Sequence, residues 1–569
     1  MSHPSFRNVV LPMANQMALL WIGVSTLAAG LGAAARGATA DPALEAWIQT
    51  ETQQAKKQIL AQIAPPSPGG NRPAGNKGSV TASLSINAPD YYYHWVRDAA
   101  ITMDEMLNLA EREPDNRDRY YGLLKDYADF SRANQQASVG AVADQGEPKF
   151  YMNGPLFTGP WGRPQHDGRA LRAMTVLRFA RALMAAGGPA NQQYVDTLYA
   201  STLPANTLLK VDLEYTSHRA NDPAAKNGYD LWEEVKGNHF FTRMAQWRAL
   251  VEGAKFANQR GDSGAAAYYA GEAGSLAQEI GKHWDNGRGY IVATLDPDNP
   301  ARKPSQLDSC VVIAALYANP RGASESLFAP TDDHVLATAV KLSDEFCKDY
   351  TINQRRSDAQ NRALQPGIGR YSEDTYDGVN TNARGNPWFL ATAALAELCY
   401  RAASDWTKAG QLTVTPLNQP FLARAIKAEG IYVALNTGEA IGRNDQRFSP
   451  IVRAVCELGD GYLRRIRTHC DQQNGSLSEE FNRDTGFMQG AHDPTWSYVA
   501  VLRTFHQRES ALAAIDTSAR PIPAARLSTR SLAAESGFIL AHKTLHLTPP
   551  IATRIVSRWQ RRHRESYFE

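Results

Sequence analysis

The chain has 569 residues, of which 43% are hydrophobic and 21% charged, and its formal net charge is +2. This length suits one large domain or two to three ordinary ones, with enough apolar residues for a sizeable core. A charge so close to neutral, without a basic stripe across the central region, argues against a nucleic-acid partner. The 11 Trp and 23 Tyr residues instead favour a ligand such as a sugar, whose ring offers apolar faces for stacking.

Residues 1–40 are predicted to be a signal peptide. An apolar or small-residue stretch runs from Met17 to Ala35, after the weakly positive Arg7, and Ala38-Thr39-Ala40 fits a small-x-small cleavage site. The stretch is nearly long enough to span a membrane, so an uncleaved anchor is the alternative. We therefore expect a secreted or periplasmic protein that has no stable membrane association after cleavage.

Helical periodicity dominates from Asp41 to about Arg508, and strand-like runs such as Tyr290–Leu295 are few and short. The sequence therefore predicts an all-α domain over residues 41–510. Amphipathic helices are expected at Leu44–Ile63, Asp98–Arg112, Asp118–Ala133, Gly168–Ala186, Phe240–Gln259, Ala265–His283, Asp333–Tyr350, Gly385–Ala402, Pro420–Ala434, Ile451–Cys470 and Thr495–His506.

Long irregular segments recur between these helices, usually after every second one. Such loops inside a compact domain are normally functional. Helix pairs that alternate with long loops fit a ring of six inner and six outer helices, in which all long loops gather on one face and build one pocket. An open solenoid is the alternative, although its repeats should resemble each other. The segments are 65–90, 138–165, 221–237, 285–306, 358–384 and 472–494.

Residues 511–569 differ from the rest, because they are rich in Ala, Ser and Arg and contain several prolines. We expect a loosely packed or disordered extension, with a basic contact to a membrane or polyanion as the alternative. The cysteines form no CxxC pair, so neither a metal centre nor another cofactor is predicted. The sequence leaves two alternatives for the cysteines: they form two disulfides and leave one free thiol, or they are small buried hydrophobic residues. The five are Cys310, Cys347, Cys399, Cys456 and Cys470.

The third long loop carries three acids around a tryptophan in the run Asn-Gly-Tyr-Asp-Leu-Trp-Glu-Glu-Val-Lys-Gly at 227–237. Because adjacent like charges repel, at least one acid among Asp230, Glu233 and Glu234 should have a raised pKa. A carboxyl protonated near neutral pH is what cleavage of a glycosidic bond needs on its leaving-group side. The alternative is a solvated helix start with Asp230 as its N-cap.

The other long loops also combine aromatic residues with charged ones. The sixth supplies Glu479, so acids from the third and sixth loops would face one pocket, which is the minimal equipment for glycoside hydrolysis. The clusters are Tyr-Tyr-Tyr-His-Trp-Val-Arg-Asp at 91–98, Trp-Gly-Arg-Pro-Gln-His-Asp-Gly-Arg at 161–169, Arg-Tyr-Ser-Glu-Asp-Thr-Tyr at 370–376, Gly-Asn-Pro-Trp-Phe-Leu at 385–390, Ser-Glu-Glu-Phe at 478–481 and His-Asp-Pro-Thr-Trp-Ser-Tyr at 492–498.

These ordered motifs, from about Tyr91 to Tyr498, resemble the family 15 glycoside hydrolases, the glucoamylases. The resemblance implies an (α/α)6 barrel and inverting removal of glucose from the non-reducing ends of α-1,4-glucans. It implies Glu233 as general acid, Glu479 as general base and Asp230 as a supporting residue or acceptor. The positions that match sugar-contacting ones are Tyr91, Trp95, Arg97, Asp98, Trp161, Trp232, Glu234, Arg370, Trp388 and Trp496.

Some residues depart from the family pattern. Glu480 stands where the family usually has Gln, which leaves the choice of base open between it and Glu479, and a like-charged neighbour should raise the pKa of the base. His94 and His166 are expected to serve packing or the rim. The chain resembles the shorter fungal type, without an N-terminal β-sandwich or a starch-binding module.

The sequence thus predicts a monomeric secreted glucoamylase that acts on an α-glucan or oligosaccharide. The first alternative is a related inverting α-glucosidase with a preference for α-1,6 linkages or trehalose, because a few loop residues decide such specificity. The second is a non-catalytic carbohydrate-binding relative on the same fold.

Overall fold

A computed structural model describes residues 41–137, 146–222, 228–471 and 473–518. The predicted signal peptide and most of the predicted extension lie outside these residues. Helices dominate the described part, which confirms the all-α prediction. The last helix, α14, runs from Thr495 to Ser518 and so continues past the boundary predicted at 510. No helix in the described part is long and apolar enough to cross a membrane.

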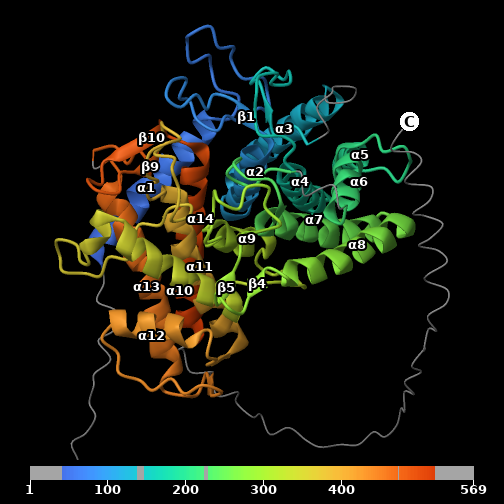
Figure 1. Ribbon diagram of the computed structural model, residues 1–569. Helices are drawn as coiled ribbons and strands as arrows, with labels where there is room; N and C mark the ends of the chain where they lie inside the picture. The colour runs from blue at the N-terminus through green and yellow to red at the C-terminus, as the bar shows by residue number, and fades with distance from the viewer. Residues whose placement is uncertain (1–40, 138–145, 223–227, 472, 519–569) are drawn as a thin grey trace, which may run out of the picture. The chain divides into compact units, whose positions relative to one another are not determined.

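Six helices form an inner ring, and each packs against the next until the last closes onto the first. This closure excludes the open solenoid and gives the predicted (α/α)6 barrel (Figure 1). In chain order the inner helices are α2 (Val96–Arg112), α4 (Asp167–Ala186), α7 (Phe240–Gln259), α9 (Cys310–Ala318), α11 (Phe389–Ala409) and α14 (Thr495–Ser518).

An outer helix packs against each inner one. Chain direction alternates between the layers, so every long segment leads from an outer helix to the start of the following inner helix. The outer helices are α1 (Pro42–Ala61), α3 (Arg117–Ala137), α6 (Leu208–Ala220), α8 (Ser263–Gly281), α10 (Asp333–Asp349) and α13 (Phe448–His469); α5 (Pro189–Leu198), α12 (Gln419–Ala428) and the short 3-10 helices η1 (Pro114–Asn116) and η3 (Thr351–Gln354) lie in the connections.

Short antiparallel strand pairs tie the long loops together. One pair joins the first and second loops, and another joins the third and fourth, so neighbouring loops on the rim brace each other. The pairs are β1 (His94–Trp95) with β2 (Lys149–Phe150), β3 (Asn238–His239) with β6 (Thr294–Leu295), β4 (Trp284–Asp285) with β5 (Tyr290–Ile291), β7 (Gln411–Thr413) with β8 (Ala440–Gly442), and β9 (Ser478–Phe481) with β10 (Met488–His492).

Three helices were not predicted from the periodicity: α5, α6 and α9. The residues of α9 are almost all apolar and buried, so the helix has no polar face to produce a period. Nearly every residue of α6 is buried too, including charged ones such as Lys210 and Asp212. The helix predicted to continue to Ala434 ends at Ala428, and Gly430 follows with a φ of +63°.

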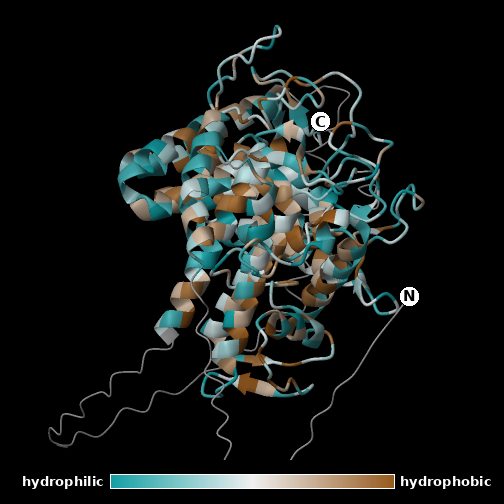
Figure 2. Cartoon of the chain, turned by 90° about the vertical axis from the view of Figure 1, so that its left-hand side faces the viewer, coloured by the Kyte–Doolittle hydropathy of each residue, from teal (hydrophilic) through white to brown (hydrophobic). Residues whose placement is uncertain are grey.

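The core fills the space between the two helical layers and extends into the inner ring. Figure 2 shows hydrophobic and hydrophilic residues alternating along individual helices, as expected of helices that bury one face. The five cysteines are free thiols in the structure, and all but Cys347 are buried. The structure therefore agrees with the small-hydrophobe alternative, and the two disulfides do not form in it.

Truncation of a ring residue should destabilise the whole domain. Leu250 of α7 is fully buried, so Leu250→Ala should lower the free energy of unfolding by about 2–5 kcal/mol through lost burial and a residual cavity. Denaturant titration measures the change. Tyr432→Ala is the control, since Tyr432 is 99% exposed, and an equal loss in both variants would contradict the prediction.

Candidate active site

A cavity of about 330 Å³ opens where the inner helices begin and the long loops converge. Five of the six long loops contribute lining residues: the first, second, third, fifth and sixth. The fourth loop contributes none, so the prediction that all six build the pocket is wrong for that loop. Glu233 and Glu479 both line the cavity. So do all ten residues with predicted sugar contacts: Tyr91, Trp95, Arg97, Asp98, Trp161, Trp232, Glu234, Arg370, Trp388 and Trp496.

The acidic segment of the third loop is a turn between antiparallel partners rather than a helix start. Tyr229 pairs with Lys236, and the backbone N–H of Asp230 donates to the carbonyl of Val235 at 2.9 Å. Asp230 Oδ1 accepts from the backbone N–H groups of Glu234 (2.8 Å) and Val235 (3.2 Å). The N-cap interpretation is therefore wrong, and Asp230 instead holds the turn closed. Asn227 lies outside the described residues.

Glu233 stands at the tip of this turn with a φ of +67°, a backbone conformation that non-glycine residues rarely adopt. Three side chains donate hydrogen bonds to its Oε1: Trp95 Nε1 at 2.9 Å, Gln165 Nε2 at 2.9 Å and Arg97 Nη2 at 3.4 Å. Trp95 and Arg97 follow the first loop and Gln165 ends the second. One carboxylate oxygen is thus fixed by donors from two other loops.

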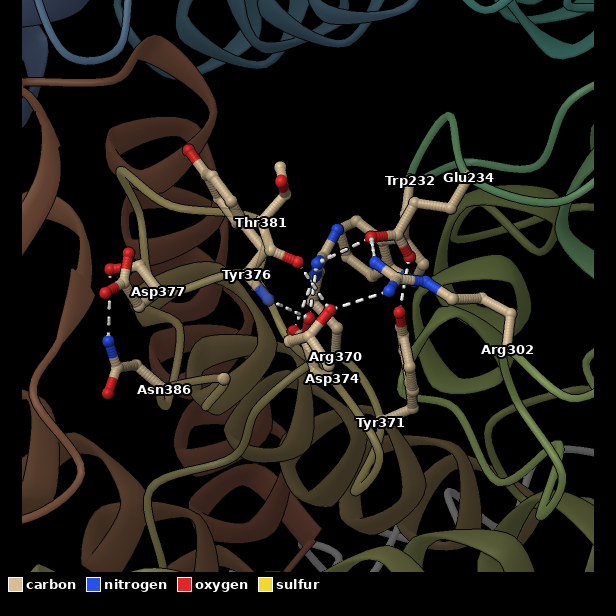
Figure 3. A network of polar contacts seen from close by, with 12 residues as sticks. Trp232, Glu234, Arg302, Arg370, Tyr371, Asp374, Tyr376, Asp377, Thr381 and Asn386 are labelled. Atoms are coloured by element: carbon tan, nitrogen blue, oxygen red, sulfur yellow. Dashed lines mark hydrogen bonds and ion pairs between the residues drawn. The ribbon is translucent and has the colours of Figure 1, made fainter. Parts of the chain in front are cut away.

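Glu234 is bound by cations and a hydroxyl from the fourth and fifth loops, as Figure 3 shows. Arg302 and Arg370 donate to Oε1 at 2.8 and 3.0 Å, and Tyr371 donates to Oε2 at 2.5 Å. Burial alone would raise the pKa of Glu234, but the charges of Arg370 and Lys303 outweigh it and lower the pKa. Glu234 is therefore an anion that faces the cavity.

A buried lysine organises the base of the third loop. Lys303 Nζ lies 2.5 Å from Asp230 Oδ2 and 3.2 Å from Asp308 Oδ2. Asp308 also accepts from the indole N–H of Trp232 at 2.9 Å. Burial acts to raise the pKa of Asp230, but the ammonium of Lys303 overcomes this and lowers it to about 2. Asp230 does not line the cavity; it lies behind the turn as a support.

The expectation of a raised pKa in at least one of the three crowded acids is not met at Asp230 or Glu234. It counted only the neighbouring carboxylates along the chain and omitted the cations that other loops supply. Asp230 and Glu234 both have lowered pKa values because Lys303 and Arg370 compensate their charge.

Glu479 and Glu480 are adjacent in β9 and so point to opposite faces of the strand. Glu479 lines the cavity, where Tyr91 and Tyr376 donate to its two oxygens at 2.9 and 3.0 Å. Glu480 is fully buried away from it and accepts from Asn386 at 2.9 Å. Burial raises the pKa of Glu480 well above its usual value, and the charge of Glu479 adds to the shift.

The environment of Glu479 also disfavours its charged form. Burial raises the pKa of Glu479, while the hydrogen bonds from Tyr91 and Tyr376 act in the opposite direction. The expected influence of the neighbouring acid therefore acts mainly on Glu480, and the geometry of the strand leaves Glu479 as the carboxylate that faces the cavity.

Asp98 is a third acid on the cavity wall. Its Oδ2 lies 3.7 Å from Arg97 Nε, and burial raises its pKa to about 6 despite that charge. His94 and His166 are both buried, so neither lies at the rim. His94 accepts from the backbone N–H of Val80 at 3.0 Å, and burial lowers its pKa to about 3.

Several functional neighbours were missed by the sequence analysis. Tyr376 binds Glu479, Gln165 binds Glu233, and Arg302 and Lys303 bind the acids of the third loop. The fourth loop lacks an aromatic cluster, so its adjacent residues Arg302 and Lys303 were the only feature of that loop that could have indicated a role at the site. In the described part of the chain, no group of three or more His, Cys, Asp or Glu residues could hold a metal ion.

The comparisons with known proteins agree on one family. The sequence model of the family described as "Glycosyl hydrolases family 15" matches residues 54–506. A glucoamylase from Blastobotrys adeninivorans is 36% identical over 441 residues, which cover 77% of this chain and 68% of the relative. Glucoamylase 1 from Rhizopus oryzae is 34% identical over 477 residues, covering 84% and 73%. Among solved structures, a glucoamylase from Saccharomycopsis fibuligera superposes with a TM-score of 0.70 at 29% identity, covering 83% of this chain and 96% of that one.

Removal of one partner of the buried lysine should destabilise the turn. Asp230→Asn leaves Lys303 with less compensation and should cost about 3 kcal/mol of unfolding free energy at pH 7. Because the folded-state pKa of Asp230 is lowered to about 2, the stability it contributes is present above pH 4 and is lost as the pH falls toward 2. Denaturant titrations measure the free energy of unfolding of the variant and of the unchanged protein at pH 7 and pH 3. The difference between the two proteins should be smaller at pH 3 than at pH 7. An equal difference at both values would contradict this account.

Proposed function

The chain belongs to glycosyl hydrolases family 15, and we propose that it is a glucoamylase with an inverting mechanism, which removes terminal α-1,4-linked glucose from the non-reducing ends of starch, glycogen or maltooligosaccharides. One observation carries the mechanism. Glu233 and Glu479, from the third and sixth long loops, line the same aromatic cavity. Paired carboxyl groups on one sugar-sized pocket are the equipment that glycoside hydrolysis requires.

Glu233 acts as the general acid. All the hydrogen bonds that the described residues donate to its carboxyl group go to Oε1, from Trp95, Gln165 and Arg97. Oε2 is therefore the oxygen that carries the proton to the glycosidic oxygen. Three donors on Oε1 orient the carboxyl group and stabilise the carboxylate that remains after proton transfer.

Glu479 acts as the general base. The hydroxyl groups of Tyr91 and Tyr376 orient its two oxygens. Because burial raises the pKa of Glu479, the carboxylate is more basic than an exposed one and removes a proton from water more readily. Attack of this water on the face opposite the leaving group inverts the anomeric carbon, which requires about 6.5–9.5 Å between the two carboxyl groups. The product is β-D-glucose.

The remaining lining residues bind the sugar. Arg97 and Arg370 offer donors, Asp98 and Glu234 offer acceptors, and together these satisfy sugar hydroxyls. Tyr91 and the tryptophans supply apolar faces for the ring. Asp230 supports the turn from behind. The tryptophans of the wall are Trp95, Trp161, Trp232, Trp388 and Trp496.

We also propose that the enzyme is exported through residues 1–40, works as a single catalytic domain with a C-terminal extension, and is a monomer. The apolar stretch from Met17 to Ala35 and the following small-residue site support export. One chain supplies both proposed catalytic acids and all ten proposed sugar-binding residues, so the proposed reaction needs no second subunit.

Product analysis tests the function. Glu233→Gln should reduce the rate of maltooligosaccharide hydrolysis by about 10²–10⁴-fold while leaving binding largely intact, because the amide keeps an acceptor for Trp95 but has no proton to give. NMR of the first product from the unchanged enzyme should show the β-anomer. An initial α-anomer, or turnover by Glu233→Gln at the normal rate, would refute the mechanism. A panel of maltose, isomaltose, starch and trehalose identifies the preferred linkage.

The two adjacent glutamates should respond differently to the same substitution. Glu479→Gln should lose most activity, since the amide cannot accept a proton from water. Glu480→Gln should keep activity within a few-fold, because burial holds Glu480 protonated and Gln has the same shape as that form. Steady-state rates on one maltooligosaccharide measure both, and a severe loss confined to Glu480→Gln would move the base by one residue.

A further inference from the structure

A second cavity, of about 280 Å³, lies further along the barrel from the first. Five inner helices line it: α2, α4, α7, α9 and α14. The first cavity takes Trp496 from the start of α14, whereas the second takes Arg503, about 10 Å later along that helix. The two cavities therefore lie at different depths along the same helical ring.

The second cavity has an excess of positive charge. Five guanidinium groups line it, against the two carboxylates of Asp104 and Glu252. Glu252 pairs with two of the arginines at 2.6 and 3.1 Å, and Asp104 pairs with another two at 3.0 and 3.5 Å. Glu111 and Glu397, outside the lining, give further compensation. The arginines are Arg178, Arg181, Arg248, Arg321 and Arg503.

Arg321 is the least compensated of these cations. It is exposed, it donates to Ser510 Oγ at 2.6 Å, and it makes no ion pair with any residue that the structure describes. After burial, the charge of Arg321 is the main cause of the lowered pKa of Arg112. This like-charge repulsion would be relieved by an anion next to Arg321.

Backbone contacts near the end of α9 account for Arg248 but not for Arg503. Arg248 donates to the carbonyl group of Ala318, the last residue of α9, at 2.5 Å and to that of Glu325 at 2.6 Å. Arg503 is 8% exposed, and its Nε is buried without a hydrogen-bond partner. Arg503 thus retains a donor that no described residue uses.

Apolar side chains form part of the remaining wall, among them Ile101, Leu171, Met174 and Leu316. Guanidinium groups bind phosphate and carboxylate groups through paired hydrogen bonds. We propose that this cavity binds a small organic anion, a phosphomonoester or carboxylate with an apolar body, whose charged group contacts Arg321 and Arg503.

The second cavity is also connected to the first. Tyr317 lines the second cavity, and its hydroxyl accepts from Trp496 Nε1 at 3.0 Å. The guanidinium of Arg503 lies 4.4 Å from the centre of the Tyr317 ring. An anion on Arg503 is therefore one side chain away from a residue that lines the first cavity. The binding of the anion itself does not depend on the proposed hydrolytic activity.

Isothermal titration calorimetry on the full chain at low ionic strength tests the proposal, with phenyl phosphate, phenylacetate, inorganic phosphate and benzyl alcohol as probes. We expect one site for at least one of the two organic anions, weaker binding of inorganic phosphate and none of benzyl alcohol. Which organic anion binds better separates phosphomonoesters from carboxylates.

Arg321→Gln should weaken this binding by about tenfold or more, because it removes a charge-assisted hydrogen bond. Arg355→Gln is the matched control, since Arg355 is exposed and does not line the cavity. Binding should persist in saturating glucose. The proposal is overturned if neither organic anion binds, if inorganic phosphate binds as tightly as both, if Arg321→Gln binds normally, or if glucose displaces the anion from the first cavity.

Discussion

Closure of the inner helical ring is the constraint on which the site depends. Glu233 and Glu479 are more than two hundred residues apart, and neither has a complete environment within its own loop. Because α14 packs against both α11 and α2, the sixth loop returns beside the first. Tyr91 of the first loop can then bind Glu479 of the sixth, while Trp95 binds Glu233 of the third.

The electrostatic design of the site follows from this convergence. Each acid is matched with partners from a different loop: Lys303 with Asp230, Arg370 with Glu234, and two tyrosine hydroxyls with Glu479. Cations lower the pKa of Asp230, which supports the turn, and of Glu234, which faces the cavity as an anion. Burial with only neutral donors raises the pKa of the acid proposed to accept a proton. The choice of partner therefore separates acids that are alike in sequence.

The ring and the gathering of loops could be predicted from the sequence, because amphipathic periods and long irregular segments are local signals. The ten binding-residue candidates on the cavity wall followed from the resemblance of the ordered motifs to a known family. The sequence did not predict α9, whose residues are buried on all sides and so lack a period. It did not predict the lowered pKa values of Asp230 and Glu234, since Lys303 and Arg370 reach them only through tertiary contacts. Local patterns identified which residues gather, whereas their charge states depend on partners distant in the chain.

The positive φ of Glu233 has a consequence for how this site can vary over evolutionary time. The backbone there favours glycine or asparagine, yet the hydrogen bonds from Trp95 and Gln165 fit only a side chain long enough to reach them. A substitution to glycine or asparagine would relieve the backbone strain but remove the carboxylate. A substitution that keeps a carboxylate would also keep the strain. No single substitution of Glu233 both relieves the backbone strain and keeps the carboxylate. Sequence change in the family is therefore expected to accumulate in the surrounding hydrogen-bond donors instead.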